Sequence, residues 1–233
     1  MELSKRLQAV ADLVSKGVTV ADVGTDHGYI PIYLCKTNRC PSAIAMDVNK
    51  GPLLRAKAHI AEYGLQELIG TRQSDGVQKL TPGEFECVVI AGMGGALTVR
   101  ILTEGEAVFR SLKEFVLQPQ SELWKVRQYL SENGYVIVQE DMVLEDGKYY
   151  PMMKVLNGSS SAYDMVELRY GRELLEQKHP VLKDFLLKEL RVKEEILENL
   201  KQKDGLHIED RQRDIHEELE GIRYVLQRYY NGD

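Results

Sequence analysis

The sequence predicts a mostly parallel, doubly wound α/β sheet with an antiparallel hairpin at its edge, followed by a C-terminal helical hairpin. Three observations predict this fold. Apolar β-branched runs alternate with segments whose apolar residues recur at helical spacing. Two strand-like runs then follow each other across a short turn, and after Ser161 the composition changes to charged, Leu-rich helix.

Length and composition restrict the class of protein. A chain of 233 residues, 43% of them hydrophobic, can hold one α/β domain and an appendage. The formal charge of -6 argues against a general nucleic-acid coat, although it leaves room for a local basic face. The N-terminus has no apolar signal core and no apolar run is long enough to span a bilayer, so we expect a cytoplasmic protein without a membrane segment.

The three cysteines predict neither a disulfide framework nor a metal site. Cys35, Cys40 and Cys87 form no Cys-x-x-Cys pair, and no histidine lies near them at metal-ligand spacing. We expect reduced, mostly buried thiols and no bound metal.

The first part of the chain predicts alternating helices and strands. Leucine and valine at helical spacing predict an amphipathic helix that ends at Gly17. A β-branched run over 18–21 predicts a strand buried on both faces, and a helix is expected from Tyr29 to Leu34. The expected continuation is a strand over 43–46, a helix over 52–63 with Leu53, Leu54, Ala58 and Ile60 inward, and a strand over 71–74.

The next part continues the alternation and ends in a hairpin. The expected elements are a strand over 85–91, a helix over 96–102, a strand over 114–118, a helix over 121–133 around Trp124 and Leu130, and hairpin strands over 135–144 and 149–156. Because helices separate the earlier strands, the sheet should be mostly parallel with an antiparallel edge pair.

A linker-like stretch, Asn-Gly-Ser-Ser-Ser over 157–161, predicts two domains, 1–157 and 162–233. Pro180 suits the first turn of a helix whose apolar stripe reaches Asp204-Gly205. Ile215, Leu219, Ile222 and Leu226 recur at roughly heptad spacing, so the two helices should form an antiparallel coiled-coil hairpin. The hairpin could position a substrate or support the core, and a coiled coil could also make the chain an assembly partner without catalysis.

Acidic residues at the ends of predicted strands indicate a nucleotide-cofactor site. Asp22 ends the first strand, and Gly24 and Gly28 follow at a spacing that lets the backbone turn tightly and approach a ligand. Asp47 ends the second strand, close to the offset of about 20 residues from the glycine turn at which an acid binds a ribose diol. Asp75-Gly76 forms a third acidic strand end.

This arrangement resembles the class I S-adenosylmethionine-dependent methyltransferases over Val18 to about Leu156. Three motifs, Asp-Val-Gly-Thr-Asp-His-Gly-Tyr-Ile-Pro at 22–31, Ser-Asp-Gly at 74–76 and Ala-Gly-Met-Gly-Gly at 91–95, together with the helical hairpin resemble the bacterial tRNA adenine-22 N1-methyltransferase family. The resemblance implies a Rossmann-like core, S-adenosylmethionine as cofactor, tRNA as partner, and methyl transfer to N1 of adenine 22 in the D-arm.

The chain departs from the general class I pattern at two places. Asp26 stands where the first motif usually has its middle glycine. The Asn/Asp-Pro-Pro-aromatic motif of amino-group methyltransferases is replaced by Ala-Gly-Met-Gly-Gly at 91–95, so methylation of an exocyclic amine is disfavoured.

The spacing and the resemblance together assign the site residues. The cofactor-binding set is Asp22, Gly24, Gly28, Asp47, Val48, Asp75, Gly76, Ala91 and Gly92. The substrate-binding set is Arg6, Met93, Gly94 and Gly95. The catalytic set is Asp26, which would stabilise positive charge on the methylated adenine and help to take up a proton, with His27 and Tyr29 as orienting or stacking groups. No dedicated nucleophile is expected, because the N1 lone pair needs alignment more than a base.

Two alternatives for the activity stay open at this point. One is an S-adenosylmethionine-dependent methyltransferase that acts on another RNA or on a small molecule. The other is a nicotinamide-dependent oxidoreductase, which would share the ribose-binding acid, although Asp26 at the helix start disfavours a pyrophosphate there. We expect a monomer.

Overall fold

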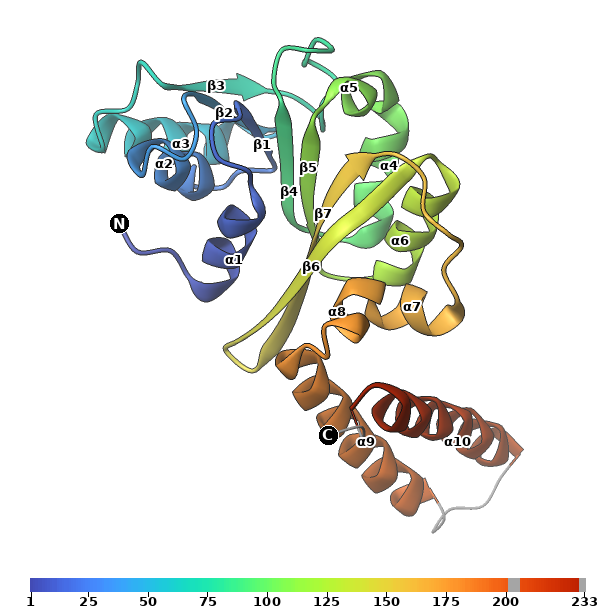
Figure 1. The fold of residues 1–233 in the computed structure, drawn as a ribbon. Coiled ribbons are helices and arrows are strands. Elements are labelled where there is room, and N and C mark those ends of the chain that lie inside the picture. Colours follow the sequence, from blue (N-terminus) through green and yellow to red (C-terminus); the bar gives the residue numbers. More distant parts are fainter. Residues whose placement is uncertain (201–205, 231–233) are drawn as a thin grey trace. The chain divides into compact units, whose positions relative to one another are not determined.

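The structure is a computed structural model that describes residues 1–200 and 206–230. It divides into two compact units, Met1–Tyr163 and Asp164–Asp233, which Figure 1 shows together. The linker-like stretch over 157–161 lies just before this division.

Within the described residues, seven strands of the first unit form one sheet in the order β3-β2-β1-β4-β5-β7-β6. The strands are β1 Val20–Val23, β2 Ala43–Asp47, β3 Ile69–Gln73, β4 Cys87–Met93, β5 Glu114–Pro119, β6 Tyr135–Glu145 and β7 Lys148–Asn157. β1 to β5 are parallel, and β7 is antiparallel to both β5 and β6. The predicted doubly wound sheet with an antiparallel edge hairpin is confirmed.

Helices cover both faces of this sheet (Figure 1). The helices of the first unit are α1 Lys5–Leu13, α2 Tyr29–Lys36, α3 Lys50–Glu62, α4 Gly95–Glu104, α5 Glu106–Ser111 and α6 Leu123–Glu132. One apolar core lies between the sheet and α1 to α3, and a second lies between the sheet and α4 to α6. β1 contributes side chains to both cores, because Val20 belongs to the first core and Ala21 to the second.

The buried faces of two helices differ from the prediction. Ala56 and Ile60 are the buried residues of α3, whereas Leu54 is 67% exposed and Ala58 is also exposed. With 100° of rotation per residue, a helix that turns Ala56 and Ile60 to the sheet must turn Leu54 to the opposite side. In α6, likewise, Trp124 is 46% exposed.

Short helices were not predicted individually. α5 has six residues, too few to show a helical period in the sequence. The same is true of α7 Met165–Tyr170 and α8 Arg172–Glu176 in the second unit. All three cysteines are free and buried.

The second unit is completed by two long helices, α9 Pro180–Leu200 and α10 Leu206–Val225, and by the π-helical turn η1 Leu226–Tyr230. Lys193 pairs with Glu218, and the Tyr230 hydroxyl donates to the carbonyl of His179. His179, just before α9, contacts Tyr230 at the end of η1, whereas Lys193, farther along α9, contacts Glu218, which comes earlier in the chain. The two helices therefore run antiparallel. The predicted helix end at Asp204-Gly205 lies outside the described residues.

An apolar seam holds α9 and α10 together. Leu197 of α9 packs with Ile215 and Leu219 of α10, and all three side chains are buried. No helix in the part of the chain that the structure describes is both long and apolar enough to cross a membrane.

Candidate active site

A cavity of about 340 Å³ opens where β1 and β4 end. Its walls come from α1, from the loop between β1 and α2, and from the end of β4. From β1 the chain continues to β2 on one side in the sheet, and from β4 it continues to β5 on the other side. The cavity therefore lies at the point where the strand order reverses, which is the usual ligand position in doubly wound sheets.

The glycine loop after β1 is anchored to the end of β2. The backbone N–H groups of Gly24 and Thr25 both donate to the carbonyl of Met46, at 2.8 and 2.9 Å. The Thr25 hydroxyl in turn accepts from the N–H of Gly28 at 3.1 Å. These bonds fix the loop that brings backbone to the cavity.

Gly24 combines an unusual backbone conformation with a close approach. Its φ is +80°, and a Cβ atom built there would lie 2.1 Å from the Met93 Cε atom. A side chain at this position would be strained and would displace Met93. The loop after β1 thus packs directly against the end of β4.

Asp22 is the buried acid of the cavity wall. Asp22 lines the cavity and is only 5% exposed. Burial raises the pKa of Asp22 to about 6, the charge of Asp47 adds to this effect, and a hydrogen bond from Thr25 opposes it. Among the described residues no lysine or arginine forms an ion pair with Asp22, so a cationic ligand group would supply the missing partner.

The ends of β2 and β3 are tied together next to this loop. The Ser74 N–H donates to the Asp47 carbonyl at 3.0 Å, and the Gln73 amide donates to the Val48 carbonyl at 2.9 Å. One carboxylate oxygen of Asp47 accepts from the N–H of Asn49 at 2.7 Å, which leaves the other for a ligand. The Val48 side chain, on a residue that is 52% exposed, is available for contact with a flat apolar group.

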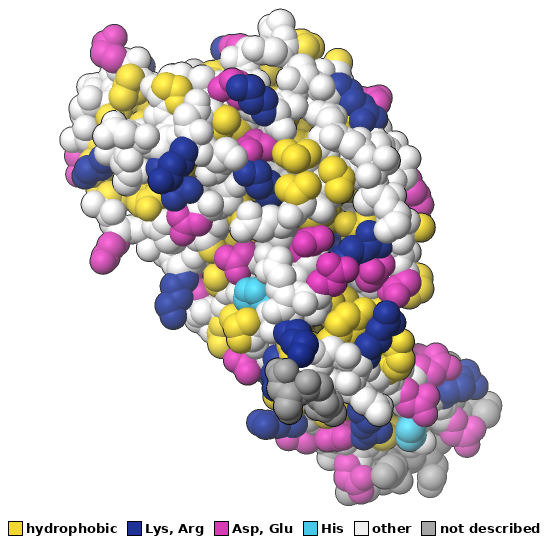
Figure 2. Space-filling model, viewed as in Figure 1, with side chains coloured by type: hydrophobic (Ala, Val, Ile, Leu, Met, Phe, Trp, Pro, Cys, Tyr) yellow, Lys and Arg dark blue, Asp and Glu magenta, His cyan; other side chains and the backbone are white. Residues whose placement is uncertain are grey.

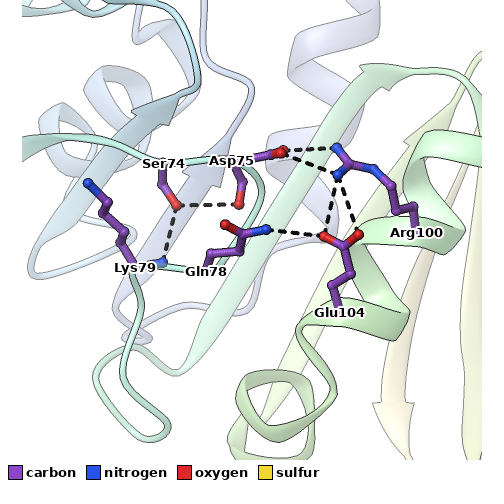
Figure 3. A network of polar contacts seen from close by, with 6 residues as sticks. All are labelled: Ser74, Asp75, Gln78, Lys79, Arg100 and Glu104. Carbon is purple, nitrogen blue, oxygen red and sulfur yellow. Dashed lines mark hydrogen bonds and ion pairs between the residues drawn. The ribbon is translucent and has the colours of Figure 1, made fainter.

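Asp75 follows β3 and is held by an arginine of α4 (Figure 3). Arg100 donates to both carboxylate oxygens of Asp75, at 2.9 and 3.2 Å. Arg100 also contacts Glu104, which accepts from the Gln78 amide. The Arg100 guanidinium lowers the pKa of Asp75, so Asp75 is an ionised hydrogen-bond acceptor at neutral pH.

Asp26 is also held by an arginine that the sequence did not indicate. Arg55 of α3 donates through two nitrogens to one carboxylate oxygen of Asp26, and His27 Nε2 lies 3.1 Å from the other. The hydrogen bond from Arg55 is the main cause that lowers the pKa of Asp26. The exposed Asp26 carboxylate is therefore suited to stabilise positive charge and poorly suited to take up a proton at neutral pH.

Three aromatic rings form a cluster beside Asp26. The ring centres of His27 and Tyr29 are 5.0 Å apart, those of His27 and His59 5.2 Å, and those of Tyr29 and His59 5.5 Å. The planes are within 17° of parallel. Since the three distances are nearly equal, the rings form a compact triangle and not a column. His59 Nδ1 donates to the His27 carbonyl at 3.1 Å, which fixes α3 to the glycine loop.

Arg6 of α1 also forms part of the cavity wall. Its guanidinium donates to the amide oxygen of Gln118, which is fully buried, at 3.0 Å and lies 5.5 Å from the centre of the Tyr150 ring. In the described parts of the chain no carboxylate pairs with Arg6. Arg6 can therefore attract an anionic group into the cavity.

The structure does not bring every predicted site residue to the cavity. Ala91 and Gly92 line it, with Gly92 at φ +86°. Gly76 lies with Asp75 beyond the cavity lining, and Gly94 precedes α4. A Cβ atom at Gly95 would lie 2.4 Å from the Ser121 carbonyl oxygen, so Gly95 packs α4 against the start of the loop before α6.

Comparison with known proteins finds methyltransferases that are similar to this chain. The family model of a methyltransferase domain matches residues 3–153. The chain is 37% identical over 172 residues to a tRNA (adenine(22)-N(1))-methyltransferase of Bacillus subtilis, and the match covers 73% of this chain and 72% of the relative.

Solved structures are similar over almost the whole chain. The Bacillus subtilis m1A22 tRNA methyltransferase TrmK matches with a TM-score of 0.83 and 30% identity, over 97% of this chain and 99% of that one. M. capricolum TrmK, in complex with the cofactor product S-adenosylhomocysteine, matches with a TM-score of 0.82 and 26% identity, over 97% of this chain and 98% of that one. The similarity therefore extends beyond the sheet into Asp164–Asp233.

Proposed function

Because the chain belongs to the bacterial tRNA adenine-22 N1-methyltransferase family of class I methyltransferases, we propose that it transfers the methyl group of S-adenosylmethionine to N1 of adenine 22 in tRNA. The observation that carries this proposal is the 37% identity to the Bacillus subtilis enzyme over 172 residues. The oxidoreductase alternative has no support among these relatives. The choice of adenine 22 over another RNA position follows from the same relatives.

The residues at the strand ends fit S-adenosylmethionine. The buried Asp22, which has no cation of its own in the described chain, would bind the ammonium of the methionine part. Asp47, which has one carboxylate oxygen without a backbone donor, would accept the ribose hydroxyls, and the ionised Asp75 would accept from the adenine amino group. A side chain at Gly92 would point toward Arg6 and Gln120 of the cavity wall, so the glycine there keeps space for the methionine chain. When bound, the cofactor supplies an electrophilic sulfonium methyl group.

Arg6 of the cavity wall is proposed as a substrate contact. Its guanidinium lines the cavity and has no carboxylate partner among the residues described. Acidic and basic side chains are interspersed on the face drawn in Figure 2, so that face offers no continuous basic surface to a polyanion. At the cavity, we expect local attraction for the RNA from Arg6.

The residues around Asp26 would act by alignment and charge. N1 of adenine has an in-plane lone pair at neutral pH, and the base must be unpaired or flipped for N1 to reach the cavity. Tyr29 and His27 offer ring faces that can orient the base. The ionised Asp26, fixed by Arg55, stabilises the positive charge that develops on the adenine ring.

The second unit, the oligomeric state and the location complete the proposal. We assign the α9–α10 hairpin to positioning tRNA, since tRNA methyltransferase structures match the chain into this unit. A monomer in the cytoplasm is consistent with an enzyme that modifies tRNA. Light scattering during gel filtration tests the monomer, and a dimer mass would reject it.

The test of the proposed function is methyl transfer to an unmodified tRNA transcript from radiolabelled S-adenosylmethionine, followed by nucleoside mass analysis. We expect 1-methyladenosine as the labelled product. A labelled 6-methyladenosine, or no label in RNA, would reject the proposed reaction. Asp47→Ala serves as the control that removes the cofactor contact.

A further inference from the structure

A second cavity, of about 350 Å³, lies beside the first. It is lined by residues 1–4, by Leu7 and by the two tyrosines Tyr29 and Tyr63. Leu7 and Tyr29 line the first cavity as well, so the two cavities share a wall. None of the acidic residues assigned to the cofactor lines the second cavity.

The shared wall is held in place by its neighbours. The Tyr29 ring stacks with His27 on the glycine loop and with His59 on α3, at 5.0 and 5.5 Å between ring centres. His59 is itself bonded to the His27 carbonyl. One wall of the second cavity is therefore the Tyr29 ring, which the active-site loop holds in place. A bulky group placed against this ring would also alter the wall of the first cavity.

The second tyrosine of the lining, Tyr63, has a cation next to its ring. Tyr63 follows α3, and the ammonium of Lys36 lies 4.6 Å from the centre of its ring. Lys36 is exposed and does not line the cavity, so its charge is available next to it. The cavity suits a planar base, because two tyrosines and the apolar Leu3 and Leu7 line it. The nearby Lys36 ammonium suits a phosphate just outside the cavity.

We propose that the second cavity binds a nucleobase of the tRNA strand directly adjacent to adenine 22. This inference rests on the proposed function, because the first cavity must hold adenine 22 for its neighbour to reach the second. The volume falls within the range of specific small-ligand sites, toward its lower end. Occupation of both cavities holds the strand on either side of Tyr29 and keeps adenine 22 out of its stack.

The experiment is a double-mutant cycle between Tyr63→Ala and tRNA transcripts that lack the base at nucleotide 21 or at nucleotide 23. With intact tRNA, Tyr63→Ala should raise KM for tRNA by about 5- to 150-fold, the range that corresponds to losing one base–aromatic stack. The kcat and the calorimetric affinity for S-adenosylmethionine should stay within about twofold, and Tyr63→Phe should restore KM. On one of the two abasic transcripts, Tyr63→Ala should cause no further loss.

Two more variants separate binding from folding. Tyr33→Ala is the matched control, since Tyr33 is also partly buried against the same core but lines neither cavity, and its KM for tRNA should be unchanged. Glu2→Trp adds a ring at an exposed lining position and should raise KM for tRNA without lowering the melting temperature.

Several results would overturn the inference. One is an unchanged KM for tRNA in both Tyr63→Ala and Glu2→Trp. Another is that the effects of Tyr63→Ala and of the missing base on KM multiply fully on both abasic transcripts. A third is that Tyr63→Ala lowers the affinity for S-adenosylmethionine as much as that for tRNA, which would assign the cavity to the cofactor. If the wild-type protein forms no 1-methyladenosine, the proposed function itself fails, and that result is distinct from the others.

Discussion

Replacement of Asp22 by asparagine should stabilise the free protein and weaken cofactor binding. The pKa of Asp22 is raised from its ordinary value of 3.8 to about 6, chiefly because the carboxyl is buried. The folded state therefore binds a proton more tightly than the unfolded state, and stability falls as pH rises from about 4 to 6. Above that window the buried charge costs about 3 kcal/mol, at 1.36 kcal/mol for each pKa unit.

Asparagine keeps the shape of the side chain and removes this cost, because it does not ionise. At pH 7 we expect Asp22→Asn to raise the free energy of unfolding by up to about 3 kcal/mol and the melting temperature by about 6–12 °C. At pH 5 the gain should be about half as large, since Asp22 is then mostly protonated in the folded protein. Thermal unfolding of both proteins at several pH values measures the difference.

Cofactor binding should change in the opposite direction. Without the carboxylate, the cofactor's ammonium loses a charged hydrogen bond that contributes about 1.5–3 kcal/mol, which is about a 10- to 150-fold loss of affinity. Calorimetry with S-adenosylmethionine measures it, and the wild type alone should lose affinity below pH 6. If Asp22→Asn is no more stable than the wild type at pH 7, or binds the cofactor equally well, the assignment of Asp22 is wrong.

Three further substitutions test separate parts of the structure. Asp47→Asn should weaken S-adenosylmethionine binding by about 10- to 100-fold in calorimetry with little change in melting temperature, and equal binding would reject the ribose contact. Asp26→Asn should keep the cofactor affinity but lower single-turnover methylation by about 100-fold, because the charge that Arg55 fixes is lost; near-normal turnover would reject this role. Arg127→Met removes the guanidinium 2.8 Å from the buried Glu140 carboxylate and should lower the free energy of unfolding by about 3–5 kcal/mol in denaturant titration, whereas a loss below about 1 kcal/mol would show that the pair is not needed.

The sequence was sufficient for the sheet and for the local motifs. All four residues of β1 and the first four of β4 are buried, and the apolar, partly β-branched composition that burial favours is visible without a structure. Asp22, Gly24 and Asp47 were recognisable because their spacing along the chain reflects the short connections between a strand, a turn and the next strand.

The side chains that hold the acids in place could not be predicted. Arg55 meets Asp26 across 29 residues of sequence, and Arg100 meets Asp75 across 25. Each arginine lies on a helix, and its partner depends on how that helix is rotated against the sheet. The same rotation turned Leu54 to solvent, so an apolar residue at helical spacing did not suffice to fix the phase of α3.

The most direct test compares two tRNA transcripts that differ only in nucleotide 22, adenine in one and guanine in the other. Each is incubated with the protein and S-adenosylmethionine and then copied by reverse transcriptase, which stops at a base methylated on its Watson–Crick edge. We expect a stop at nucleotide 22 and one equivalent of 1-methyladenosine by mass in the adenine transcript, and neither in the guanine transcript. A stop at another nucleotide, or 1-methyladenosine in both transcripts, would contradict the assignment of adenine 22 as the methylated base.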